Sequence, residues 1–202
     1  MDIILATQNL HKVREYRGML EKLEKFKDLE IISLHDLNDY TPPEETGETF
    51  QENALLKAQH ASFFFNKWAL ADDSGLVIPS LNGAPGVYSA RYAGKGSSDS
   101  ENRKKLMEKI KNINNDSRMA YFECCIAISA PDGFHKCVRG TCEGTILDVE
   151  KGNNGFGYDP IFVKSGYKKT FAQLDETIKN KVSHRRKALD QILLLLENLL
   201  EN

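Results

Sequence analysis

Short apolar runs of the kind that form buried strands alternate along this chain with helical patterns. The runs lie at Ile3–Ala6, Ile31–Leu34 and Trp68–Ala71. Ile3–Ala6 is short and continuous, which is typical of a strand covered on both faces. Between the runs, apolar residues recur at helical spacing over 13–23 and 49–66, which predicts amphipathic helices. Strands that alternate with helices in this way favour an α/β fold.

The second half of the chain adds a predicted hairpin. Strand patterns over 121–129 and 136–146 flank the turn sequence Ala130–Gly133, and so short a turn joins antiparallel strands. The other expected elements are a loop-rich stretch over 76–96, a helix over 99–113, a strand at 162–163 and a closing helix over 183–200. A hairpin beside alternating strands and helices indicates a mixed β-sheet with flanking helices.

The composition excludes several classes of protein. Of 202 residues, 41% are hydrophobic and 28% are charged, which excludes disordered and collagenous chains. The longest apolar run, Ile192–Leu196, is too short to span a membrane, and the N-terminal segment lacks the features of a secretory signal. The four cysteines have no metal-ligand spacing, so we expect reduced thiols. We therefore expect one cytoplasmic domain over residues 1–202, with no membrane contact.

The charge balance bears on the partners of the protein. The chain has 27 Lys and Arg against 29 Asp and Glu, a net charge of -2. A dedicated binder of nucleic-acid polymers usually presents a net basic face, so near-neutrality disfavours such a partner. The cations are nevertheless unevenly spread, because Lys179–Lys187 contains five of them and no acid. That segment is either a solvated helix face or a site for phosphate or a base carbonyl.

Polar residues join the first predicted strand to the first helix. Thr7, Gln8 and Asn9 follow the strand, and Lys12 lies in the first helical turn. The N-terminus of a helix offers unpaired N–H groups and a positive dipole end, which suit a phosphate. The segment lacks the glycines of a Walker loop. Asn9 as a simple helix cap, with Lys12 in solvent, is the alternative interpretation.

Carboxylates gather at two places. Glu45 and the preceding acid stand before a glycine turn, and Asp72 and Asp73 follow a predicted buried strand. Paired acids suit a hard cation, and the carboxyl ends of strands are where α/β sheets place ligands. Asn53 and Lys57 lie four residues apart, so they share one helix face. The alternatives are a solvated loop that leads into a capping box, and a solvent-exposed turn.

A glycine-rich segment near residue 155 carries an aromatic residue. Phe156 stands between Gly155 and Gly157, and Asp159 precedes Pro160. Glycines allow the backbone to approach a ligand closely, and the ring offers a face for stacking. The residue before a proline is held extended, which fixes the direction of the carboxylate. A packed loop without a ligand is the alternative.

Taken in order, these motifs resemble the inosine/xanthosine triphosphate pyrophosphatase family, the RdgB-like house-cleaning enzymes. The matching segments are Ala6–Lys12, Glu45–Ala58, Ala71–Leu76, Gly83–Arg91, Phe156–Pro160 and Ser183–Arg185. The resemblance implies a two-lobed α/β fold around a long mixed sheet with flanking helices, a central nucleotide cleft, and a homodimer. It implies Mg²⁺-dependent hydrolysis of dITP, ITP and XTP to the monophosphate and pyrophosphate, which keeps deaminated purines out of DNA and RNA.

The resemblance also implies roles for particular residues. Asp73 is the expected general base and, with Glu45, a ligand of Mg²⁺. The residues expected to bind the triphosphate are Thr7, Gln8, Asn9, Leu10, His11, Lys12, Ser74 and Lys179. The residues expected around the purine are Phe156, Gly157, Tyr158, Asp159, His184 and Arg185. Gln8 departs from the glycine that the family commonly has there, which leaves the contact of Gln8 itself open.

The predicted contact of Arg185 with the base gives a reason for selectivity. A guanidinium donates to the O6 carbonyl of hypoxanthine or xanthine but meets the N6 amine of adenine donor to donor. This argument excludes adenine and not guanine, which also has O6. Two alternatives stay open: a pyrophosphatase for dTTP, UTP or modified pyrimidine nucleotides, and a non-catalytic nucleotide- or RNA-binding protein that uses Lys179–Lys187.

Overall fold

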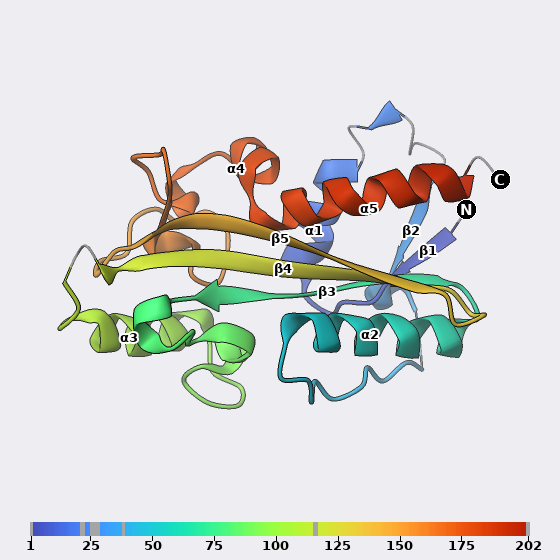
Figure 1. Cartoon of the computed structure of the whole chain (residues 1–202), viewed down its shortest axis with the longest axis horizontal. Helices are drawn as coiled ribbons and strands as arrows, with labels where there is room; N and C mark the ends of the chain where they lie inside the picture. Colours follow the sequence, from blue (N-terminus) through green and yellow to red (C-terminus); the bar gives the residue numbers. More distant parts are fainter. Residues whose placement is uncertain (1, 21–22, 25–28, 38, 115–116, 201–202) are drawn as a thin grey trace. The chain divides into compact units, whose positions relative to one another are not determined.

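The computed structural model describes residues 2–20, 23–24, 29–37, 39–114 and 117–200. In this part of the chain, the strands form one mixed six-stranded sheet in the order β2-β1-β3-β4-β5-β6 (Figure 1). Helices flank the sheet, so the predicted α/β class with a mixed sheet is confirmed. Among these residues, we find no helix that combines the length and the apolar character needed to cross a bilayer.

The parallel part of the sheet contains a change of direction. Strand β1 (Asp2–Leu5) pairs in parallel with β2 (Glu30–Ser33) on one side and with β3 (Trp68–Val77) on the other. Helix α1 (Leu10–Leu20) connects β1 to β2, and helix α2 (Phe50–Phe65) precedes β3. From β1 the chain connects to β2 on one side, and it later returns to β3 on the other side of β1. The carboxyl end of β1 is therefore a topological switch point, where α/β sheets bind ligands.

The predicted hairpin is present. Strands β4 (Met119–Ser129) and β5 (His135–Ile146) are neighbours in the sheet, and β6 (Phe162–Lys164) pairs antiparallel with β5. The other helices are α3 (Asp99–Ile110), α4 (Glu176–Val182) and α5 (His184–Leu200). The sequence interpretation missed α4, because its seven residues are too few to show a helical repeat.

The chain divides into two compact units. The first comprises residues 1–73, 124–140 and 185–202, and the second comprises 74–123 and 141–184. The expectation of one domain over residues 1–202 stays a prediction.

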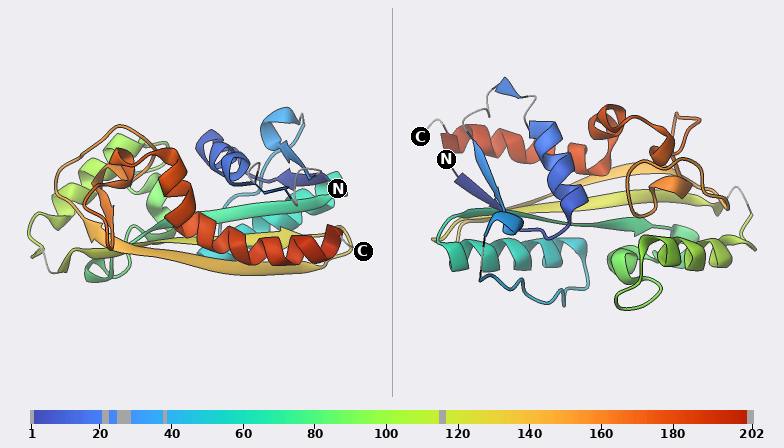
Figure 2. Two further views of the ribbon diagram at one scale, coloured as in Figure 1. Left: turned by 90° about the horizontal axis from the view of Figure 1, so that it is seen from above. Right: turned by 180° about the vertical axis from the view of Figure 1, so that it is seen from behind.

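The first unit has a helix layer on each face of its strands. Figures 1 and 2 show α1 and α5 on one face and α2 on the other. Successive residues of a strand point to opposite faces of the sheet, so Ile3 and Leu5 lie on the same face. They pack with α1 and α5 in one core cluster. On its inner side α2 presents the fully buried Ala54, Ala58 and Ala61. Such small side chains let a helix backbone come close to a sheet.

The second unit has its own core. Apolar residues of β3, β4 and β5 pack with α3 and with the segment that contains β6. Phe122, Phe162 and Phe171 form a cluster of tilted and stacked rings at centroid distances of 4.7 to 6.1 Å. Gly144 of β5 is required there, because a Cβ atom would lie 2.3 Å from the Val163 carbonyl oxygen.

Strand β3 corrects one sequence expectation. The apolar run predicts a strand over Trp68–Ala71 with Asp72–Gly75 at its end, but the strand continues through these residues to Val77, so the alternative of a solvent-exposed turn is wrong. Asp and Gly have low strand propensity, yet tertiary context overrides propensity in a central strand. The consequence is that Asp72 and Asp73, as consecutive strand residues, point to opposite faces of the sheet.

Candidate active site

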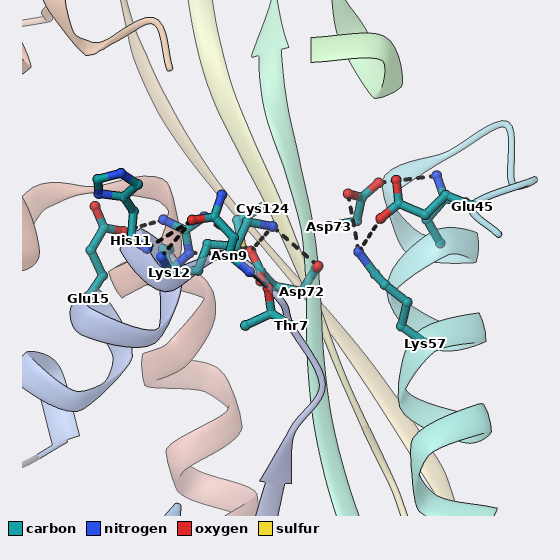
Figure 3. Close-up of polar contacts among 12 residues, drawn as sticks. Thr7, Asn9, His11, Lys12, Glu15, Glu45, Lys57, Asp72, Asp73 and Cys124 are labelled. Atoms are coloured by element: carbon teal, nitrogen blue, oxygen red, sulfur yellow. Dashed lines mark hydrogen bonds and ion pairs between the residues drawn. The ribbon is translucent and has the colours of Figure 1, made fainter. Parts of the chain in front are cut away.

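The first candidate site lies just past the end of β1. The pairing of β1 with β3 ends at Leu5 and Leu70, and the Ala6 N–H donates to the Leu70 carbonyl at 2.7 Å. The chain then turns away into the Thr7–Asn9 loop. Figure 3 shows Asp72 of β3 on the side of this loop and Asp73 on the other side of the strand, next to Glu45 and Lys57.

Asn9 caps helix α1. Its Oδ1 accepts from the backbone N–H groups of His11 at 2.9 Å and Lys12 at 3.3 Å, and Thr7 Oγ1 accepts from the Asn9 N–H. The capping interpretation of Asn9 is therefore confirmed. Gln8 and Leu10 are exposed, and Thr7 is buried. The alternative that Lys12 lies free in solvent is wrong, because its ammonium pairs with Asp72 at 3.0 Å.

Asp72 is the centre of a buried ionic network that comprises Lys12, Glu15, Asp72 and Arg185. Asp72 is fully buried, and its Oδ2 accepts from Arg185 Nη2 at 3.1 Å and Nε at 3.3 Å. Arg185 Nη1 also donates to Glu15. Burial alone would raise the pKa of the Asp72 carboxyl, but the charges of Lys12 and Arg185 outweigh burial and hold this pKa well below its ordinary value. Asp72 is thus an ionised anchor for two cations.

Asp73 lies in a second group, the carboxylate cluster, which comprises Glu45, Asn53, Lys57 and Asp73. Asn53 Nδ2 donates to Asp73 Oδ2 at 3.2 Å, and Lys57 Nζ lies 3.5 Å from Asp73 Oδ1. Lys57 Nζ also donates to Glu45 Oε1 at 2.7 Å (Figure 3). The prediction that Asn53 and Lys57 share one helix face is confirmed, because both reach the same carboxylate.

The loop that carries Glu45 is tied to α2. Asn53 Oδ1 accepts from the Gly47 N–H at 2.8 Å, and the Asn53 amide donates back to the Gly47 carbonyl at 3.4 Å. A Cβ atom on Gly47 would lie 2.7 Å from Asn53 Oδ1. Thr49 and Glu52 form the predicted capping box at the start of α2. These contacts fix Glu45 beside Asp73.

The electrostatics of the carboxylate cluster suit a proton acceptor and a metal. Burial is the largest influence on Asp73 and raises the pKa of its carboxyl, against the lowering effect of Lys57 and Lys12. A raised pKa makes Asp73 a stronger base than an ordinary aspartate. Glu45 and Asp73 supply hard oxygen ligands, and Mg²⁺ commonly uses one or two carboxylates together with substrate phosphates. The residues present therefore fit Mg²⁺.

The second candidate site is the aromatic loop, residues 152–160, in the second unit. Asp159 Oδ2 accepts from the Phe156 N–H at 2.9 Å and from Lys179 Nζ at 2.5 Å. The Lys179 ammonium lies 4.7 Å from the centroid of the Phe156 ring, and Lys179 is 4% exposed. Gly155 has a φ of +74°, and a Cβ atom there would lie 2.0 Å from Asp159 Oδ2. The loop is therefore shaped around the Asp159 carboxylate.

Neighbouring residues hold the aromatic loop in place. The Gly157 N–H donates to Asp99 Oδ2 at 2.6 Å, and Arg103 donates to the Gly157 carbonyl at 2.8 Å. The buried Tyr158 donates its hydroxyl proton to the Ser89 carbonyl at 2.9 Å. These contacts give Gly157 and Tyr158 a supporting role in shaping the loop.

Two other predicted residues of the second unit, His184 and Ser74, lie outside the aromatic loop. The ring of His184 stacks on Phe122 at a centroid distance of 4.8 Å. Ser74 follows Asp73 in β3 and is partly buried.

The predicted residues therefore fall into two groups. Thr7 to Lys12, Glu45, Asp73 and Arg185 belong to the first unit, and Ser74, Phe156 to Asp159, Lys179 and His184 belong to the second. Lys179 was expected to assist at the triphosphate, but its described contacts are with Asp159 and the rings of Phe156 and Phe171.

Sequence reasoning did not assign a role to four residues that the structure places in these clusters: Asn53, Lys57, Asp72 and Glu15. Lys57 contacts both predicted metal ligands, and its helical spacing from Asn53 carried a signal for this. Asp72 stands next to the predicted base, but its pairing with Arg185 joins residues 113 positions apart. Glu15 shows no signal in the pattern of α1, although it is only 4% exposed.

Comparison with known proteins places the chain in a family. The model of the Ham1 family matches residues 3–194. The chain belongs to the Ham1 family. Among curated relatives of this Ham1 chain, the dITP/XTP pyrophosphatase of Protochlamydia amoebophila is 54% identical over 200 residues, covering 98% of this chain and 99% of the relative. The dITP/XTP pyrophosphatase of Chlamydia trachomatis serovar L2 is 48% identical over 203 residues, covering 100% and 96%.

A solved structure agrees with this assignment. The Staphylococcus aureus Ham1 protein matches with a TM-score of 0.83 at 43% sequence identity, covering 100% of this chain and 98% of that chain. The six-stranded mixed sheet with flanking helices is therefore a Ham1 fold.

Proposed function

We propose that this Ham1 protein hydrolyses noncanonical purine nucleoside triphosphates, dITP, ITP and XTP, to the monophosphate and pyrophosphate. The observation that carries the proposal is Asp73, a buried carboxylate with a raised pKa that lies beside Glu45 and a lysine at a switch point of the sheet. Relatives that share about half of its residues over their whole length are named dITP/XTP pyrophosphatases.

The loop after β1 is the proposed binding site for the triphosphate. Lys12 supplies a cation from the first turn of α1, and Thr7 supplies a hydroxyl from the loop. Because Asp72 holds the ammonium of Lys12 in place, this cation is set before substrate arrives. A preset charge loses less conformational entropy when it binds phosphate than a mobile surface lysine does. The same segment contains Gln8, Asn9, Leu10 and His11, and their predicted contacts with the phosphates are part of this proposal.

Asp73 is the proposed general base. It takes a proton from a water molecule, whose oxygen forms a bond to the α-phosphorus while the bond to the bridging oxygen breaks and pyrophosphate leaves. Asn53 and Lys57 contact the two Asp73 oxygens and fix the direction of the carboxylate. Glu45 and Asp73 are the proposed ligands of Mg²⁺, which supplies positive charge against the phosphoryl oxygens and makes nearby water more acidic.

The aromatic loop is the proposed site for the purine. The ring of Phe156 offers a stacking face, and the ammonium of Lys179 beside it is a donor suited to an O6 carbonyl. An amine at the same position, as in adenine, would face this donor with another donor. The contacts of Asp159, His184 and Arg185 with the base edge remain predictions. Ser74 is proposed to assist at the phosphates.

The test is pyrophosphate release from dITP, ITP, XTP, dTTP and dATP in the presence of Mg²⁺. We expect turnover of the first three and little of the last two. Preference for dTTP would support the pyrimidine alternative, and no turnover of any purine triphosphate would overturn the proposal.

The same assay tests the catalytic residue. Asp73→Asn should lower kcat by at least about a hundredfold, because a general base commonly contributes 10²–10⁴-fold, while nucleotide binding stays measurable. Asp190→Asn, on an exposed face of α5, is the control and should retain the wild-type rate. Near-normal turnover by Asp73→Asn would contradict the assignment.

A further inference from the structure

The ammonium of Lys57 lies against both carboxylates that the proposed function assigns to the metal. It lies 2.7 Å from Glu45 Oε1 and 3.5 Å from Asp73 Oδ1. Its side chain is 11% exposed, so water screens this charge much less than it screens a surface lysine. Lys57 therefore supplies positive charge to the oxygens that a divalent cation would use.

Helix α2 fixes this lysine in place. Ala54 and Ala58, which flank Lys57 in the helix, are fully buried. One turn before it, Asn53 binds Asp73 Oδ2 and the Gly47 backbone. These contacts hold the backbone of α2 on both sides of Lys57.

The charges of the carboxylate cluster disfavour binding of a divalent cation in the absence of nucleotide. The carboxylates of Glu45 and Asp73 and the ammonium of Lys57 together have a single net negative charge. A divalent cation also meets the repulsion of Lys57, which is strong for buried charges a few ångströms apart. A bound triphosphate adds several negative charges, which attract the cation and offset its repulsion by Lys57. Mg²⁺ is commonly held by carboxylates and substrate phosphates together.

We infer that Lys57 is a built-in competitor of the metal, so that the carboxylate cluster binds a divalent cation weakly alone and tightly only together with the nucleotide. The inference rests on the proposed function for the location of the metal. Lys57 acts here as a positioning and charge-setting residue.

The experiment is Mn²⁺ binding followed by electron paramagnetic resonance, with and without an α,β-methylene analogue of ITP. Wild type should bind free Mn²⁺ weakly and bind it far more tightly with the analogue. Lys57→Met should bind free Mn²⁺ at least about tenfold more tightly than wild type, since a like charge is removed from the site. Lys57→Arg keeps the charge and should stay weak.

Lys67→Met is the matched control, because it removes a lysine from an exposed ion pair with Asp2 in the same unit. Its affinity for Mn²⁺ should equal that of wild type, and a thermal melt of each variant checks folding. Equal or weaker binding of Mn²⁺ by Lys57→Met, or no binding by any variant, would overturn the inference. Pyrophosphate release by wild type is measured separately, so failure of the proposed function is distinguished from failure of this one.

Discussion

Asp72 and Asp73 are adjacent in the chain, yet their surroundings shift the pKa of the two carboxyls in opposite directions. Burial would raise both values, but Lys12 and Arg185 pair with Asp72 and lower its pKa. Around Asp73 the nearby Glu45 adds to burial, and the pKa rises despite Lys57. Environments that separate two carboxyl pKa values in this way separate their roles. Asp72 is suited to hold cations, and Asp73 is suited to accept a proton.

The raised pKa of Asp73 has a consequence for stability. A raised pKa in the folded state means that folding favours the protonated carboxyl. Its stabilising contribution is complete below the unfolded-state pKa of about 3.9 and is lost as the pH rises through the folded-state value. At pH 7, the ionised Asp73 therefore lowers the free energy of unfolding.

We expect Asp73→Asn to raise the Tm at pH 7 in the absence of metal and nucleotide, because the buried negative charge is gone. The difference from wild type should narrow at pH 4, where more of the wild-type carboxyl is protonated. Calorimetry in the presence of EDTA measures both values. A Tm at or below that of wild type at pH 7 would show that the charge of Asp73 is fully compensated by its partners.

At the scale of elements, one glycine decides the shape of the aromatic loop. Gly155 has a positive φ and leaves no room for a side chain beside Asp159. Gly133, in the turn between β4 and β5, has a φ of +94° but nothing within 4 Å of an added Cβ. The two glycines share the backbone requirement and differ in the space around them.

Gly155→Ala should therefore raise the KM for dITP by about tenfold or more, since strain and collision of about 1–3 kcal/mol fall on the loop itself. The change in kcat should be smaller, because the contacts of Asp73 are unaffected. Gly133→Ala causes a similar backbone strain, but this strain lies away from the aromatic loop. This variant should therefore keep the wild-type KM. Steady-state kinetics on the three proteins give the comparison, and an equal KM for all three would contradict the role of Gly155.

At the scale of the whole molecule, the family resemblance predicts a homodimer. The segment Gly83–Tyr88 is the proposed contact, and Tyr88 is a large aromatic that is 60% exposed. Exposed aromatics are enriched among the residues that dominate protein interfaces.

We expect wild type to sediment with twice the mass of one chain and Tyr88→Asp to shift toward the monomer. Met119→Asp changes another exposed apolar residue, which is 64% exposed, and should leave the dimer intact. Analytical ultracentrifugation reports both masses. A wild-type monomer would remove the dimer prediction, and an unchanged dimer in Tyr88→Asp would place the interface elsewhere.

The sequence by itself determined the α/β class, the hairpin and most of the helices, because strand and helix periodicities are local properties. It also predicted that Asn53 and Lys57 act on one side of a helix, since four residues make about one turn. Their common contact with Asp73 follows that prediction. Patterns of this kind need only the chain within a few residues of each position.

Only the tertiary structure decided how the charges are paired. Arg185 lies 113 positions from Asp72 and 170 from Glu15, and no local pattern links them. The continuation of β3 through Asp72–Gly75 depends on its central place in the sheet, against the propensity of these residues. Electrostatic interactions act through space and grow strong when water is excluded. The roles of Asp72 and Lys57 therefore emerged only when residues far apart in the sequence were brought together and buried.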